Sequence, residues 1–105
     1  MPEIYGINFD GEVTPLMVRD AMIRCFYDAH CADTGLEGDQ ESNRVYCRDT
    51  VVKAFHDAGE DFDHPTKTGI IKAMSQLREF SKNFRDPSII EKHAAQISQL
   101  VERIK

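Results

Sequence analysis

The chain has 105 residues, of which 41% are hydrophobic and 30% are charged, a balance typical of a globular protein rather than a disordered one. Its length fits a single domain over residues 1–105, and no apolar run approaches the roughly 20 residues that span a bilayer. The N-terminus lacks a signal-peptide pattern, and three cysteines without a CxxC spacing favour a reducing compartment, so we expect a soluble, cytoplasmic protein.

The net charge of −5 conceals a division along the chain. Residues 1–63 carry five basic and fourteen acidic side chains, a net charge of −9. Residues 64–105 carry eight basic and four acidic side chains, a net charge of +4. Such asymmetry favours an interaction surface, although two halves that face each other, within one chain or across a dimer, would explain it equally well.

Residues 1–13 are predicted to form a short extended segment or β-hairpin. Residues 3–9 are rich in strand-forming side chains, and Asp10-Gly11 is typical of a tight hairpin turn. Because an isolated hairpin is barely stable, this segment has to pack on the helices or pair with another chain.

The first predicted helix covers about residues 15–31. Thr14 supplies a capping hydroxyl, and Pro15 takes the first helical position, where its missing N–H costs nothing. Two apolar stripes lie side by side on this helix, so it should be central and covered on two sides. The main stripe is Val18, Met22, Cys25, Phe26 and Ala29, and the second is Leu16, Ile23, Tyr27 and His30.

The second predicted helix covers about residues 40–58 and follows a glycine-containing loop. Asp39 or a neighbour can cap its N-terminus, and Gly59 stands where the end of a helix favours a left-handed residue. The predicted inner face is Cys47, Val51, Ala54, Phe55 and Ala58.

The third predicted helix covers about residues 65–84, with Asp63 or His64 as its cap and Pro65 in its first turn. Gly69 weakens the first turns by roughly 1 kcal/mol relative to alanine, which suggests a close packing contact at this position. The predicted inner face is Ile70, Ala73, Met74, Leu77, Phe80 and Phe84.

The fourth predicted helix covers about residues 87–104 and begins with the same pattern at Asp86-Pro87. Almost no loop separates it from the third helix, so the two are predicted to form an antiparallel hairpin packed on the first two helices. The predicted fold class is all-α, a four-helix bundle-like domain with a short N-terminal extended segment or β-hairpin. The inward residues of the last helix are Ile90, Ala94, Ile97, Leu100, Val101 and Ile104.

Basic side chains along one flank of the third helix are the best indication of function. They lie beside its apolar face on a helical wheel, and Lys92 and Arg103 extend the positive charge onto the fourth helix. Such a flank can contact an acidic protein surface or nucleic-acid phosphates, and a solvated helix face would look the same. The candidate partner-binding residues are Lys67, Ile71, Arg78, Lys82 and Arg85.

His93 lies between Ile90 and Ile97 on the apolar seam of the fourth helix. A buried histidine has to find a hydrogen-bond partner or remain neutral. Because no nucleophile or partnered acid is visible in the sequence, we interpret His93 as a buried or interface histidine rather than a catalytic one.

A metal-binding or enzymatic protein is a further alternative. The paired spacing of a structural zinc site is missing, the acidic residues over 57–63 do not follow a calcium-loop pattern, and no nucleophile or dinucleotide motif is present. No catalytic residue, metal ligand or cofactor is therefore assigned. The residues such a function would use are Cys31, His30, His56, His64 and His93.

The sequence as a whole favours a non-catalytic, helical protein-interaction module or accessory subunit. Its partner would be another protein or a second copy in a homodimer, and no membrane is involved. Nucleic-acid binding through the basic flank of the third helix is the alternative.

Overall fold

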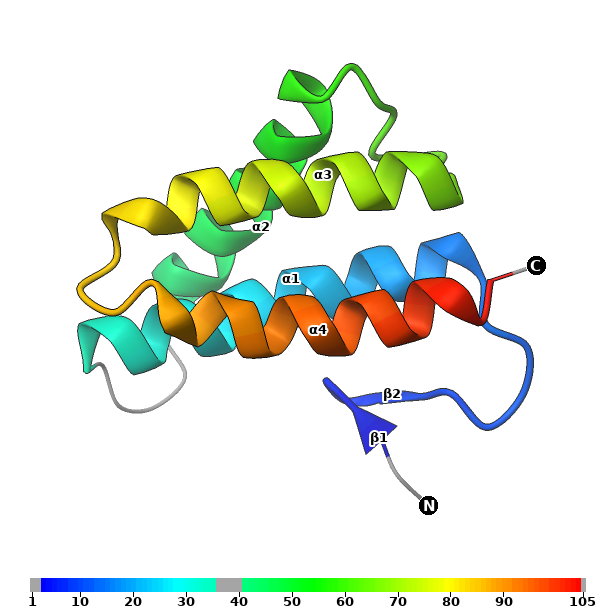
Figure 1. Cartoon of the computed structure of the whole chain (residues 1–105), viewed down its shortest axis with the longest axis horizontal. Coiled ribbons are helices and arrows are strands. Elements are labelled where there is room, and N and C mark those ends of the chain that lie inside the picture. The colour runs from blue at the N-terminus through cyan, green and yellow to red at the C-terminus, as the bar shows by residue number, and fades with distance from the viewer. Residues whose placement is uncertain (1–2, 36–40, 105) are drawn as a thin grey trace.

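A computed structural model describes residues 3–35 and 41–104, and in these ranges four α-helices pack against one another (Figure 1). The predicted all-α fold class is confirmed. The elements are β1 (Glu3–Ile4), β2 (Ile7–Asn8), α1 (Pro15–Thr34), α2 (Glu41–Asp57), α3 (Lys67–Phe80), the 3₁₀ helix η1 (Ser81–Asn83) and α4 (Ser88–Glu102).

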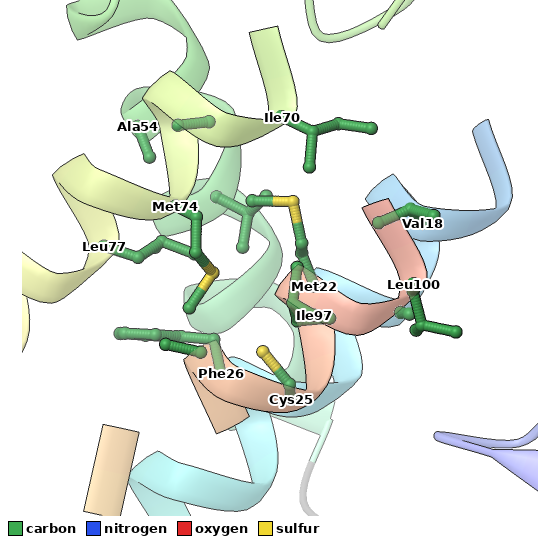
Figure 2. Packing of buried hydrophobic residues seen from close by; sticks show 14 of the residues in the cluster. Val18, Met22, Cys25, Phe26, Ala54, Ile70, Met74, Leu77, Ile97 and Leu100 are labelled. Carbon is green, nitrogen blue, oxygen red and sulfur yellow. The ribbon is translucent and has the colours of Figure 1, made fainter. Parts of the chain in front are cut away.

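The core forms around α1, which contacts α2, α3 and α4. Figure 2 shows Met22, Cys25 and Phe26 of α1 among apolar side chains of the other helices. Every residue of the predicted main stripe of α1 is buried. Burying a large aliphatic or aromatic side chain stabilises the fold by about 1.5–3 kcal/mol, so this central helix supplies much of the driving force for folding.

The helix α1 begins as predicted and ends later than predicted. The Thr14 hydroxyl accepts a hydrogen bond from the Met17 N–H at 3.3 Å, with Pro15 next in the chain. The helix continues past Cys31 because the left-handed residue that stops it is Gly35, with φ of 71°. The predicted cap of α2, Asp39, lies outside the described residues.

The C-terminus of α2 is closed by Gly59, as predicted. Gly59 has φ of 73°, its N–H donates to the carbonyl of His56 at 3.0 Å, and the N–H of Glu60 donates to the carbonyl of Phe55 at 2.9 Å. This pair of bonds is the Schellman motif, which satisfies carbonyls at the end of a helix. On the inner face Cys47, Val51, Ala54 and Phe55 are buried, and Ala58 is half-buried after the last helical residue.

The predicted start of the third helix is wrong, because Thr66 caps α3 in place of Asp63 or His64. The Thr66 hydroxyl accepts a hydrogen bond from the Gly69 N–H at 3.0 Å, and the helix begins at Lys67. The close contact predicted at Gly69 is present, because a Cβ atom there would lie 3.2 Å from the Glu60 carboxylate.

Phe62 anchors the connector before α3. Phe62 is buried and meets Phe55 edge-on at a ring distance of 5.7 Å. The guanidinium carbons of Arg19 and Arg48 lie 4.5 and 5.4 Å from its ring centre, and Arg19 donates to its carbonyl at 3.0 Å. The chain bends over residues 62–64 and becomes helical only after Thr66.

The end of α3 was also predicted too late, since the regular helix stops at Phe80 and continues as η1. The buried Ser81 hydroxyl donates to the Leu77 carbonyl at 2.8 Å, which competes with regular helical bonding. Phe84 then has extended backbone angles and is half-buried. The antiparallel arrangement of α3 and α4 is as predicted (Figure 1).

The helix α4 starts one residue later and ends two residues earlier than predicted, at Ser88 and Glu102, and its N-cap residue is Pro87 rather than Asp86. The Asp86 carboxylate accepts hydrogen bonds from the N–H and hydroxyl of Ser88, and the helix begins at Ser88. All the residues predicted to point inward from this helix are buried, including Ile104, which follows its last turn.

The N-terminal segment forms a hairpin within the chain, with its turn at Tyr5-Gly6 and not at Asp10-Gly11 as predicted. Tyr5 and Gly6 have φ of 54° and 75°, the combination that a two-residue hairpin turn favours. The chain then reaches the C-terminal end of α4, where Val13 pairs with Ile104 in a parallel bridge.

Gly59 offers a direct test of the left-handed cap. Because no atom lies within 4 Å of a Cβ built there, Gly59→Ala should destabilise the protein through backbone strain alone, by about 1–2 kcal/mol. Gly11→Ala is the matched control, since it is equally open and has no positive φ. Urea unfolding measures both, and equal effects would contradict the role of Gly59.

Candidate functional site

A groove runs between α3 and α4, with a volume of about 340 Å³. Its walls are mainly apolar, from Ile70, Met74, Ile97 and Val101, and small side chains such as Ala94 leave it open. Three of the predicted partner-binding residues line this groove, namely Lys67, Ile71 and Arg78.

Ile71 is the feature of the groove that most needs an explanation. It is 52% exposed although it stands beside an apolar surface. The other large hydrophobic residues of comparable exposure in the described ranges, Leu16, Val45 and Tyr46, belong to α1 and α2. An exposed isoleucine at the edge of an apolar groove is typical of a surface on which a partner buries its own apolar side chains.

The basic flank of α3 is partly neutralised by acidic neighbours. Arg78 forms a two-pronged ion pair with Glu91 of α4, at 3.1 and 2.8 Å, and Lys82 pairs with Glu79 at 3.0 Å. Lys67 donates to the carbonyl of Ile104 at 3.4 Å. These contacts lower the positive charge that α3 offers to any anionic partner, whether a phosphate backbone or an acidic protein surface.

The remaining predicted residues lie beyond the groove. Lys82 lines an adjoining hollow together with Arg78 and Glu91. Arg85 follows η1, is exposed, and forms no ion pair with the described part of the chain. Of the predicted partner-binding residues, three therefore line the groove and two, Lys82 and Arg85, lie outside it.

His93 is half-buried and has a hydrogen-bond partner, the Tyr5 hydroxyl, 2.6 Å from its Nδ1 atom. Burial lowers the pKa of His93 from its ordinary value of 6.5, while the charge of Asp28 acts in the opposite direction. Burial also raises the pKa of Tyr5, so the hydroxyl keeps its proton at neutral pH, and the imidazole tautomer decides which of the two groups donates the hydrogen bond. This contact ties the N-terminal hairpin to α4.

The cysteines are free thiols, and two of them are buried. Burial raises the pKa of Cys25, and burial followed by the neighbouring Cys31 raises the pKa of Cys47 to about 12. Because the thiolate is the reactive form, neither buried cysteine is activated as a nucleophile at neutral pH.

The other candidate histidines do not gather into a common site. His56 and His64 are exposed, and the His64 Nδ1 atom lies 3.1 Å from the Asp61 carboxylate. That hydrogen bond lowers the pKa of Asp61, as does the N–H of Asp63. Within the part of the chain that the structure describes, no group of three or more His, Cys, Asp or Glu side chains could hold a metal ion.

None of the helices in residues 3–35 and 41–104 combines the length and apolar character that crossing a membrane requires. No family model matches the chain, and neither a curated protein nor a solved structure matches it.

The lowered pKa of His93 predicts a pH dependence of stability. As pH falls below about 6.5, the unfolded chain takes up this proton before the folded chain does, so stability should decrease until the folded-state pKa is reached. His93→Gln should flatten the dependence of the unfolding free energy between pH 7.5 and 5.5, measured in urea.

The matched control is Gln96→Ala, an exposed change on the same helix that removes no titrating group. It should keep the wild-type slope. A slope that is identical in wild type and His93→Gln would contradict the assignment.

Proposed function

We propose that this protein is a non-catalytic, helical protein-interaction module that binds an acidic amphipathic helix in the groove between α3 and α4. The observation that supports this most strongly is the half-exposed Ile71 at the lip of an apolar groove. A groove between two helices is a common receptor for a third, whose apolar face it takes in.

The dimensions of the groove suit a short helix. Lys67 and Arg78, at its two ends on α3, are eleven residues apart in sequence, which corresponds to about 16 Å along a helix axis. A helix of about three turns spans that distance. Its apolar residues would meet Ile71 and Met74 and cover the exposed part of the groove.

Charge favours an acidic partner. Residues 64–105, which contain α3 and α4, carry a net charge of +4. Lys67 stands at one end of the groove and Arg78 at the other, and Glu102 of α4 is the one acidic residue among the described residues that line it. The partner of Arg78, Glu91, is an exposed carboxylate that a competing acid can displace. Two copies that met symmetrically through this groove would bring like charges together, so a different acidic surface is the better match.

The affinity of a designed peptide tests the proposal. The probe is a 14-residue amphipathic helix of leucine, alanine and glutamate, and an otherwise identical helix with lysine for glutamate is its control. The acidic helix should bind the full chain, and the basic helix should bind at least tenfold more weakly. Calorimetry at low and high salt measures both.

Ile71→Asp should weaken binding of the acidic helix at least tenfold, because completing the burial of an isoleucine is worth about 1 kcal/mol and the new carboxylate repels the peptide. Leu16→Asp is the matched control, since Leu16 is 48% exposed on α1 and does not line the groove. Equal losses in both variants, or no binding at low salt, would rule out the groove.

The solution mass by light scattering distinguishes the partner classes. A monomer at low and high salt leaves the groove open for another protein, as proposed. A dimer that separates in salt and in Ile71→Asp would make the acidic half of a second copy the occupant instead.

A further inference from the structure

A second hollow lies where α1, α2 and the residues after α3 meet, and it shares no lining residue with the groove. Its volume is about 490 Å³, within the range of roughly 300–1,000 Å³ found for small-molecule sites. Aromatic rings from three parts of the chain form much of its wall. They are Phe26 and His30 of α1, Tyr46 of α2, and Phe80 and Phe84 at the end of α3 and beyond.

Two of these rings are inclined to the ring of His30. The Tyr46 ring lies 5.2 Å from it at 45°, and the Phe84 ring lies 6.5 Å from it at 56°. Phe26 is 2% exposed and forms the buried part of the wall, whereas Tyr46 is 53% exposed, so aromatic surface at the hollow is in contact with water. The face of an aromatic ring carries partial negative charge and attracts a cation placed over it.

Asp33 supplies negative charge to the same hollow. It follows His30 by three residues on α1, so the two side chains are neighbours on one flank of the helix. The Asp33 Oδ1 atom accepts a hydrogen bond from the Asp86 N–H at 3.1 Å. This bond leaves the carboxylate its negative charge and its second oxygen. A carboxylate beside aromatic rings is the combination that attracts an organic cation.

Lys53 also lines the hollow, and its charge is already compensated. Its ammonium forms an ion pair with Asp57 at 2.9 Å, which draws it toward the C-terminal end of α2, away from Tyr46. Tyr46 and Lys53 are seven residues apart on this helix, about 10 Å along its axis. That separation exceeds the screening length of about 8 Å at physiological salt, so Lys53 repels a cation beside Tyr46 only weakly.

The charge of the whole chain favours a cation as well. The net charge is −5, and residues 1–63, which contain α1 and α2, carry −9. The long-range field of the molecule therefore raises the local concentration of cations and lowers that of anions. Arg85, which follows Phe84 in the chain, is not among the described residues that line the hollow.

From this arrangement we propose that the hollow binds a small organic cation of the quaternary ammonium class. The methyl groups of the ligand contact the exposed part of the Tyr46 ring and the ring of Phe84, and the Asp33 carboxylate balances its charge. A primary ammonium would have to give up its hydrogen bonds with water, whereas a methylated ammonium presents only C–H groups and therefore suits aromatic faces.

Titration of the ¹⁵N-labelled full chain with choline, followed by NMR, tests the inference. Choline should shift the amides around His30, Tyr46 and Phe84 saturably, with a Kd of about 1 mM or below, and should leave those around Ile71 unchanged. Two probes are controls: 3,3-dimethylbutan-1-ol has the shape of choline without its charge, and ethanolamine has the charge without the methyl groups. Each should bind about fivefold more weakly or worse.

Asp33→Asn tests the contribution of the charge. Asparagine keeps an oxygen that can accept from the Asp86 N–H, so the link to the residues before α4 is preserved. Choline binding should weaken about fivefold, and binding of 3,3-dimethylbutan-1-ol should stay the same. Asp49→Asn is the matched control, because Asp49 is exposed on α2, does not line the hollow and changes the net charge equally.

Tyr46→Ala tests the contribution of the aromatic face. It should weaken choline about fivefold, whereas Tyr46→Phe, which keeps the ring, should retain binding. Val45→Ala is the matched control for Tyr46→Ala, because both side chains are 53% exposed and Val45 does not line the hollow.

The inference is overturned if the choline shifts do not saturate, if the neutral probe binds as tightly as choline, or if Asp33→Asn and Asp49→Asn bind choline equally well. Amide shifts centred on the α3–α4 groove would overturn it as well. Its outcome is independent of the peptide experiment, because the two hollows have separate linings.

Discussion

The fold depends on covering α1. This helix has 20 residues, its main apolar stripe is buried, and its second stripe is partly buried beside it, so no single neighbour could shield it from water. The hairpin of α3 and α4 and the helix α2 together supply that cover, and the core side chains of Figure 2 come from all four helices. The N-terminal segment is attached to α4 and its end, since Tyr5 bonds to His93 and Val13 pairs with Ile104.

The two hollows follow from how this cover is assembled. The helix α3 packs mainly on α2 and α4 mainly on α1, so the contact of α3 with α4 is the looser one. Small side chains at facing positions, Ser75 on α3 and Ala94 and Ser98 on α4, leave the groove unfilled there. The second hollow arises where α3 gives way to η1, because the break turns Phe84 away from the position that a continuous helix would give it.

Helical periodicity predicted the buried faces well because burial repeats with the geometry of the helix. The ends of the helices were harder to predict, because neighbouring residues can each act as the cap and a tertiary contact decides between them. Nothing in the local pattern at Asp63 or His64 reveals that Phe62 is held between Arg19 and Arg48. The groove was partly predictable, because Lys67, Ile71 and Arg78 share one flank of a helix. The aromatic hollow was not, because its rings come from distant segments and Phe80 and Phe84 fit the core pattern.

Charge acts locally in this molecule. The whole chain carries −5, so its long-range field does not attract anions, and charges farther apart than about 8 Å are largely screened at physiological salt. The cations beside the groove, Lys67 and Arg78, therefore act only on a partner that has already arrived. In the proposed complex, apolar complementarity has to supply the first part of the binding energy. In that complex, the cations then select among partners that fit, which is why the acidic and basic helices of the same shape are compared.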